Sequence, residues 1–252
     1  MKKENVAKIL TVSMVGIMMT GGGVSVAAAD GGAMDSHGYV TFEQNTDPAT
    51  PINPTDPTEP VGPKDPADPT DPHEPGTAGP LSIDYVSNFH FGTQKASGKD
   101  QVYTASLDKV YKKTDGSEVQ VPNFVQVTDN RGSNAGWHLT VKQNGQFKTS
   151  GSQELDGAQI TLKNSHLNGT DMTDSSIQPT TASGDIVLDP SGAASDVMNA
   201  EVNKGMGTWL TSFGDDTTTG AKSVELFVPG KAKKEASDYS TTLTWTLTDT
   251  PA

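Results

Sequence analysis

The chain has 252 residues, which is enough for one or two domains, and a formal net charge of −13. An acidic surface repels phosphate backbones. The charge therefore argues against nucleic acid as a partner, and against simple electrostatic adhesion to anionic wall polymers or lipid headgroups. The chain contains no cysteine, so an exported domain of this sequence must be held together by packing, without disulfides.

The first 29 residues have the features of a secretory signal peptide. Three lysines lie among the first eight residues, an apolar run follows over residues 9–26, and three alanines end it at Ala29. A membrane anchor is the alternative, but Gly21–Gly23 interrupts the run and shortens its apolar part below the roughly 18 residues that a span needs. We therefore expect a signal peptide over 1–29 and a secreted chain that is not a transmembrane protein.

Residues 30–45 form a short polar segment with one alternating stretch, "YVTFE" at Tyr39–Glu43. Val40 and Phe42 alternate with more polar neighbours, a period of two that is typical of a strand. Two interpretations stay open: the stretch pairs with the main domain as one added strand, or it is disordered.

Residues 46–80 are a low-complexity tract of prolines with acidic residues between them. Proline fixes φ and disfavours helix at the residue before it, so the tract predicts an extended polyproline II linker, which like charges stiffen further. At about 3.1 Å per residue such a linker would reach on the order of 100 Å. We interpret it as an acidic, Asp/Pro-rich spacer.

From residue 81 onward, short alternating segments are separated by turn dipeptides. Asp115-Gly116 and Asn144-Gly145 each lie between two such segments, which is a hairpin signal, and Asp156-Gly157 precedes a further strand pattern.

The end of the chain continues the same pattern. "SVELFVPG" and "YSTTLTWTLTD" predict two closing strands, whereas "SDVMNAEVNK" at 195–204 predicts either a short helix capped by its first serine or a loop. Strands about ten residues apart with turn signals between them predict an all-β fold. We expect a single β-sandwich or barrel-like domain over 81–252, after the signal peptide and the linker.

Two of the three tryptophans share the pattern Trp-x-Leu, in "GWHLTV" and in "LTWTLTDTPA". Because side chains on a strand alternate between faces, Trp137 shares a face with Leu139, and Tyr239 shares one with Trp245 and Leu247. Each pattern is an apolar stripe with polar backing, which is typical of a half-buried strand. Two interpretations stay open: both stripes are core anchors, or one or both indoles stay exposed and stack on sugar rings or fill a partner's groove.

The third tryptophan lies in "GMGTWLTSFG", where flanking glycines suggest a loop. An aromatic residue on a loop is a candidate for contact with a ligand or partner. The alternative is that Trp209 plugs the end of the sandwich. The candidate motif and binding residues are therefore Trp137, Leu139, Trp209, Tyr239, Trp245 and Leu247.

Five segments carry a more specific pattern: "LSIDYVSNFHFG", "VPNFVQVTDNRG", "GWHLTVKQNGQF", "GTWLTSFG" and "YSTTLTWTLTDTP". Together they resemble the WxL domain, a family of surface proteins of low-GC Gram-positive bacteria, over about Leu81 to Ala252. The signal peptide, the acidic spacer and the order of the segments fit the same family. His90 stands where family members often carry an acid, which we treat as a neutral variation.

The resemblance implies non-covalent attachment to the cell wall at the cell surface, with peptidoglycan or another cell-envelope glycan as the ligand. It also implies association with other WxL proteins and with membrane-anchored surface proteins. Trp137/Leu139 and Trp245/Leu247 match the signature motif of the family. The resemblance does not imply that these residues contact the ligand. The alternative function is a structural subunit of a surface complex, which binds a membrane-anchored partner rather than the wall directly.

The sequence offers little for catalysis. The five histidines show no metal-ligand spacing, and no phosphate-binding loop or hydrolase motif is found, so we expect no metal, no cofactor and no enzymatic activity. Asp215-Asp216 and the pair Asp171/Asp174 are interpreted as solvated loop acids or weak calcium ligands rather than as paired carboxylates of a wall hydrolase. No sorting signal with a hydrophobic tail precedes the final "TDTPA", so we expect retention at the surface to come from binding.

Overall fold

The computed structural model describes residues 33–67, 71–170 and 172–252. The predicted signal peptide lies outside these residues. The chain divides into two compact units, of which the first ends at Thr41 and the second is Phe42–Ala252. Within the described residues no helix or strand begins before Ile52, so Tyr39–Glu43 forms no strand in this structure.

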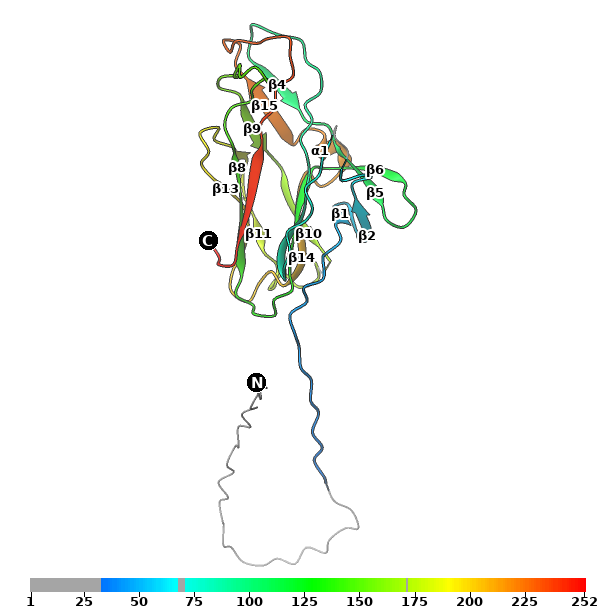
Figure 1. Ribbon diagram of the computed structural model, residues 1–252. Coiled ribbons are helices and arrows are strands. Elements are labelled where there is room, and N and C mark those ends of the chain that lie inside the picture. The colour runs from blue at the N-terminus through cyan, green and yellow to red at the C-terminus, as the bar shows by residue number, and fades with distance from the viewer. Residues whose placement is uncertain (1–32, 68–70, 171) are drawn as a thin grey trace, which may run out of the picture. The chain divides into compact units, whose positions relative to one another are not determined.

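The second unit is nearly all β, which confirms the predicted fold class (Figure 1). Its strands form four antiparallel sheets of four strands each. A single helical turn, α1 (Thr217–Gly220), connects two of the strands. A sandwich-like arrangement results, because apolar faces of three of the sheets share one large core.

The first sheet, called the central sheet here, supplies one half of that core. Its order is β10 (Ser165–Gly169), β14 (Gly207–Phe213), β7 (Phe124–Asp129) and β3 (Leu81–Val86). All six residues of β7 are buried, because this strand is covered on both faces. Val125 and Val127 face the main core, and Phe124 faces a second, smaller core on the other side.

The second sheet, called the motif sheet here, faces the central sheet across the main core. Its order is β11 (Thr180–Thr181), β13 (Ser195–Ala200), β8 (Trp137–Gln143) and β16 (Leu243–Thr248). Buried and partly exposed residues alternate strictly along β8. This alternation places Trp137, Leu139 and Val141 in the core, as the sequence pattern predicted for one face.

The third sheet, the upper sheet in Figure 1, extends the same core. Its order is β12 (Ile186–Val187), β9 (Gln159–Leu162), β15 (Val224–Val228) and β4 (Gln101–Thr104). Ile160, Leu162 and Leu226 contribute to the main core. The strands predicted after Asp156-Gly157 and in "SVELFVPG" are β9 and β15, so both predictions are confirmed.

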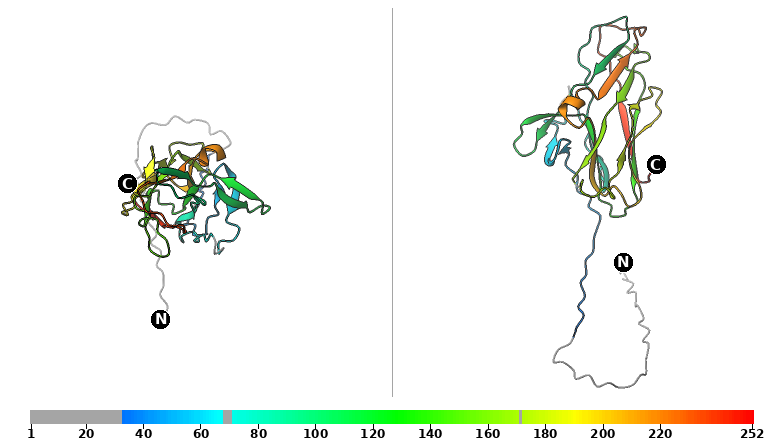
Figure 2. Two further views of the ribbon diagram at one scale, coloured as in Figure 1. Left: turned by 90° about the horizontal axis from the view of Figure 1, so that it is seen from above. Right: turned by 180° about the vertical axis from the view of Figure 1, so that it is seen from behind.

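The fourth sheet, called the hairpin sheet here, lies to one side of the other three in Figures 1 and 2. Its order is β1 (Ile52–Asn53), β2 (Asp56–Gly62), β5 (Asp108–Lys112) and β6 (Glu118–Val121). Asp115-Gly116 connects β5 to β6, and Gly116 has a φ of 73°, so this hairpin is confirmed.

The predicted free linker over 46–80 is wrong, because β1 and β2 come from that tract. Ile52 and Val61 are buried in the smaller core beside Phe124. The Gln126 side chain also holds this segment: its Oε1 accepts the N–H of Ile52 at 2.8 Å, and its Nε2 donates to the Thr50 carbonyl at 3.2 Å. Two bulky apolar residues and one buried amide therefore outweigh the polyproline preference of the tract.

Two further expectations are corrected by long-range pairing. Asn144-Gly145 follows β8 in the chain but is not the turn of a hairpin, because β8 pairs with β13 and β16 rather than with the segment that comes next. Residues 195–200 form β13 rather than a helix or a loop, because Val197, Met198 and Ala200 are buried against the main core. In both places, partners distant in the sequence override the local signal.

Candidate functional site

The two Trp-x-Leu segments are neighbours in one sheet. β16 pairs antiparallel with β8, so that Trp245 lies opposite Val141 and Leu247 lies opposite Leu139. The two motifs therefore form one structural unit, although about a hundred residues separate them in the chain.

The first motif is part of the core. Trp137 and Leu139 are both 0% exposed. The indole Nε1 of Trp137 donates a 2.9 Å hydrogen bond to the carbonyl of Gly205. A Cβ on Gly205 would lie only 2.5 Å from that nitrogen, so the glycine is required for the contact. A side chain enclosed in this way cannot touch an external ligand.

Trp209 is also a core residue, and its prediction as a loop residue is wrong. It lies on β14, is 1% exposed, and donates from Nε1 to the Met206 carbonyl at 3.0 Å. Gly169 lets the neighbouring strand approach the ring closely, because a Cβ there would lie 2.8 Å from the indole. A glycine on the neighbouring strand therefore makes room for this indole.

The second motif lies at the surface. Tyr239, Leu243, Trp245 and Leu247 are half-buried and pack against the main core, while the threonines between the β16 residues are exposed. The Tyr239 hydroxyl accepts the N–H of Glu235 at 2.8 Å. Of the three tryptophans, Trp245 is the one with surface available to a ligand or partner.

An apolar groove of about 280 Å³ runs beside β16. We call it the edge groove. Its apolar lining includes Phe89 and Phe91, which follow β3, together with Phe147, Leu243 and Trp245. Its rim is polar and carries His73, Glu74 and Asn88.

The polar rim is held by hydrogen bonds to Asp71. Its Oδ1 accepts from Asn88 Nδ2 at 2.7 Å and lies 3.0 Å from His90 Nε2. The His73 ring stacks on Tyr85, with ring centroids 5.4 Å apart. The segment around residues 71–74, predicted as free linker, is therefore one wall of the groove.

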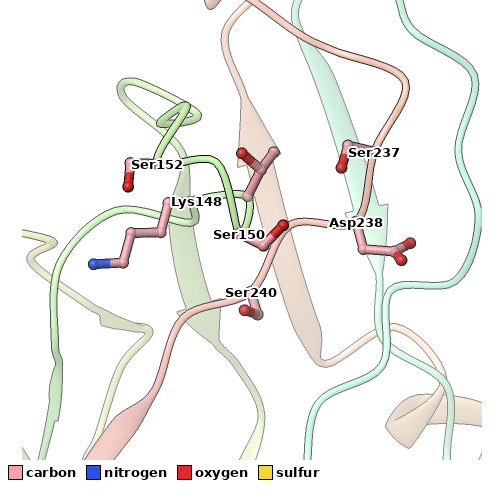
Figure 3. Close-up of a pocket in the computed structure, with 7 residues that line it drawn as sticks. Lys148, Ser150, Ser152, Ser237, Asp238 and Ser240 are labelled. Atoms are coloured by element: carbon pink, nitrogen blue, oxygen red, sulfur yellow. The ribbon is translucent and has the colours of Figure 1, made fainter.

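A second, polar pocket of about 470 Å³ adjoins the start of β16, and we call it the end pocket (Figure 3). Its lining is almost entirely hydroxyl-bearing, with one cation and one carboxylate: Lys148, Thr149, Ser150, Ser152, Ser237, Asp238 and Ser240. The backbones of Lys148 and Ser240 exchange two hydrogen bonds, at 2.9 and 3.0 Å, which tie its two walls together. Figure 3 shows the Lys148 and Asp238 side chains on opposite sides of the pocket.

Neither pocket was found by sequence reasoning. The lining of each comes from segments far apart in the chain, such as residues 148–152 and 237–240 for the end pocket. Serine-rich turns are too common to signal a site. The aromatic pair in "NFHFG" was the single available cue for the edge groove.

Two buried aspartates lie between the central and hairpin sheets and serve the fold. Burial raises the pKa of the Asp108 carboxyl, and hydrogen bonds from Ser87 and Tyr85 oppose this shift. Burial likewise raises the pKa of Asp84, against hydrogen bonds from Ser82, Thr128 and Gln126. Both carboxyls have hydrogen-bond partners inside the protein: Asp108 joins the hairpin sheet to the central sheet, and Asp84 bonds within the central sheet, so both have structural roles.

The acid pairs considered for catalysis or calcium have ordinary roles where they are described. Asp216 caps α1 by accepting the N–H of Thr219 at 2.7 Å, and Asp215 accepts the Thr219 hydroxyl at 2.6 Å. Asp171 lies outside the described residues, and Asp174 accepts from the N–H and hydroxyl of Ser176. Across the described ranges, no group of three or more histidines or acids is placed to hold a metal ion.

Among the described residues no helix is long and apolar enough to cross a membrane. No curated protein and no solved structure matches the chain. The family model of the WxL domain, described as surface cell wall-binding, matches residues 29–251. The match includes residues 46–62, as expected if these are part of the fold. The chain therefore belongs to the WxL-domain family of cell-wall-binding surface proteins.

Proposed function

We propose that the chain is secreted and attaches non-covalently to the Gram-positive cell wall by binding the glycan of peptidoglycan. The end pocket is the observation that carries this proposal. Peptidoglycan presents hydroxyl, acetamido and carboxyl groups, and the pocket presents matching hydroxyls, one ammonium and one carboxylate.

The chemistry of the pocket suits recognition by many moderate hydrogen bonds. Serine and threonine hydroxyls both donate and accept, so they adapt to sugar hydroxyls of either orientation. The ammonium of Lys148 suits a carboxylate of the polymer, because a charge-assisted hydrogen bond is stronger than a neutral one. The net charge of −13 argues against bulk electrostatic adhesion, so binding depends on such local contacts.

Sedimentation with protein-free peptidoglycan sacculi tests the proposal. Residues 30–252 should be used, because a chain that begins at residue 81 lacks Ile52 and Val61 of the smaller core. The protein should pellet with the sacculi, and the double variant Lys148→Gln, Asp238→Asn should bind about tenfold more weakly. Lys109→Gln, an exposed lysine on the hairpin sheet, is the matched control and should bind normally.

Retention of the unmodified protein in the supernatant would refute direct wall binding. Loss of sacculus turbidity over hours would instead indicate a wall hydrolase, and would contradict the assignment as a binding protein.

The edge groove supports a second candidate function, that of a structural subunit in a surface complex with a membrane-anchored partner. An apolar groove beside an unpaired strand edge is suited to a protein segment, which adds backbone hydrogen bonds to apolar contact. In this case sedimentation should require the partner, and Trp245→Ala should abolish it while the end-pocket variants bind normally.

A further inference from the structure

The stretch Gly38–Glu43 has the composition of a strand, but it forms none in the structure. Its apolar side chains are strongly exposed: Tyr39 is 92% exposed, Val40 is 76% exposed and Phe42 is 89% exposed. Single exposed apolar residues are ordinary on a surface, but Val40 and Phe42 are two positions apart, so in an extended stretch they form one apolar face, and Tyr39 lies on the other.

The free edge of β16 is a matching acceptor. β16 ends the motif sheet and is paired on one side, with β8. The N–H of Asn144 donates to the carbonyl of Thr242 in this register. Because hydrogen-bonded pairs alternate along an antiparallel ladder, the N–H and C=O groups of Leu243, Trp245 and Leu247 point away from β8, toward the open edge.

Other edges of the sandwich are less suited to a new strand. On the opposite side of the sandwich, β10 and β11 contact each other across the two sheets. The β3 edge is approached by Thr77, whose N–H donates to the Ile83 carbonyl at 2.8 Å. At β16 the open backbone edge coincides with an apolar groove.

We infer that Gly38–Glu43 of one copy adds as an antiparallel strand to β16 of a second copy, so that the protein assembles with itself on the wall. The inference goes beyond wall attachment, because it concerns contacts between copies. In the register that the side chains select, Phe42 lies opposite Trp245 and Val40 lies opposite Leu247. Both donor residues then exchange backbone hydrogen bonds with the open edge; the Phe42 side chain lies beside Trp245 at the edge groove, and the Val40 side chain extends the apolar face along Leu247, which lies outside the groove.

The outward side chains fit the same register. Thr41 of the donor lies opposite Thr246 and continues the exposed threonine row of β16. Glu43 lies opposite Thr244, which is itself opposite Lys142 of β8, so the donor's acid and this lysine share a face of the sheet, two strands apart. In this register Tyr39–Glu43 lie opposite residues 244–248, which are five of the six residues of β16. If the donor strand were shifted by one residue along β16, its side chains would change faces and Phe42 would point into water.

Analytical ultracentrifugation of residues 30–252 provides the first test. Association should increase with concentration, and the double variant Val40→Ser, Phe42→Ser should weaken it about tenfold or more. Both residues are exposed, so the variant should fold normally. Met34→Ser, at an exposed methionine outside the stretch, is the control and should associate as the unmodified chain does. A monomer at every concentration, or association that survives the double variant, would overturn the inference.

The absence of cysteine permits a second test of the register. Thr41 and Thr246 form a non-hydrogen-bonded pair in the proposed ladder, whose Cα separation of about 4.5 Å suits a disulfide. Thr41→Cys in one protein and Thr246→Cys in another should give a mixed disulfide on oxidation. Thr114→Cys, at an exposed threonine of the hairpin sheet, replaces Thr246→Cys in the control and should cross-link poorly.

A chain that carries both Thr41→Cys and Thr246→Cys distinguishes strand addition between two copies from strand addition within one chain. A disulfide within one chain, formed at a rate independent of concentration, would overturn assembly between copies. Sacculus binding is measured on the same Val40→Ser, Phe42→Ser variant. It should be unchanged, because the end pocket lies outside the donor stretch, so failure of assembly and failure of wall binding give different results.

Discussion

The assignment of Trp137 to the core gives a prediction that can be worked out from its contacts. Trp137→Ala removes a fully buried indole, which costs about 3–5 kcal/mol of unfolding free energy for a side chain of this size. Trp137→Phe keeps an aromatic ring but removes the donor to the Gly205 carbonyl. Because Gly205 is buried, its carbonyl then lacks a partner, which costs about 1–3 kcal/mol.

Urea unfolding followed by far-ultraviolet circular dichroism measures both values. The unfolding midpoint should fall for both variants with an unchanged m-value, more for alanine than for phenylalanine. In thermal melts, about 2–4 °C per kcal/mol is expected for a domain of this size, so the alanine variant should melt roughly 6–20 °C lower. Val202→Ala, at a residue 60% exposed, is the control and should stay within about 0.5 kcal/mol of the unmodified protein.

One result would refute the assignment. If Trp137→Ala kept its unfolding midpoint while losing affinity for sacculi, the first motif would contact the ligand, and its enclosure in the core would be wrong. Loss of stability together with normal binding of the folded fraction agrees with the structure.

Three further substitutions test other parts of the fold. Gly205→Ala should cost more than about 2 kcal/mol of unfolding free energy in urea, because its φ is 78° and the added Cβ would collide with Trp137. Gly116→Ala is the control: its φ is 73° but the space around it is open, so it should cost about 1 kcal/mol. Equal costs for the two variants would contradict the packing explanation. Burial raises the pKa of Asp108 in the folded state, so its stabilising contribution is complete below the ordinary pKa and is lost as pH rises through the raised one. The unfolding free energy of Asp108→Asn should therefore improve relative to the unmodified chain as pH rises, in urea titrations from about pH 3 to 8, and a difference that shrinks instead would show the opposite sign. Val61→Ala should destabilise the domain by roughly 2 kcal/mol because the valine is fully buried. An unchanged unfolding midpoint would instead support the interpretation of this tract as a free linker.

The candidate site was only partly predictable. The alternation in "GWHLTV" correctly predicted which side chains of β8 share a buried face. The same alternation in β16 predicted one apolar and one polar face, but it carried no information on how deeply each is buried. Trp245 is half-exposed because β16 is an edge strand, and the position of a strand within its sheet is not a local property of its sequence.

Errors occurred where local composition competed with distant partners. The tract with Ile52 and Val61 is rich in proline, yet it forms β1 and β2 because two apolar side chains find a small core. The glycines around Trp209 suggested a loop, but Trp209 lies within β14, and it is Gly169 of the neighbouring strand that makes room for its indole. In each case the deciding contact joins residues many positions apart, beyond the range of a pattern read along the chain.

The sequence by itself determined the all-β class, the Asp115-Gly116 hairpin and the family, because these depend on side-chain alternation, turn residues and motif order, all of which are local. The tertiary structure decided which tryptophan reaches the surface, that the proline-rich tract is part of the fold, and where the edge groove and the end pocket lie. These depend on which strands become neighbours, and strand pairing is a balance of burial and hydrogen bonding over the whole chain.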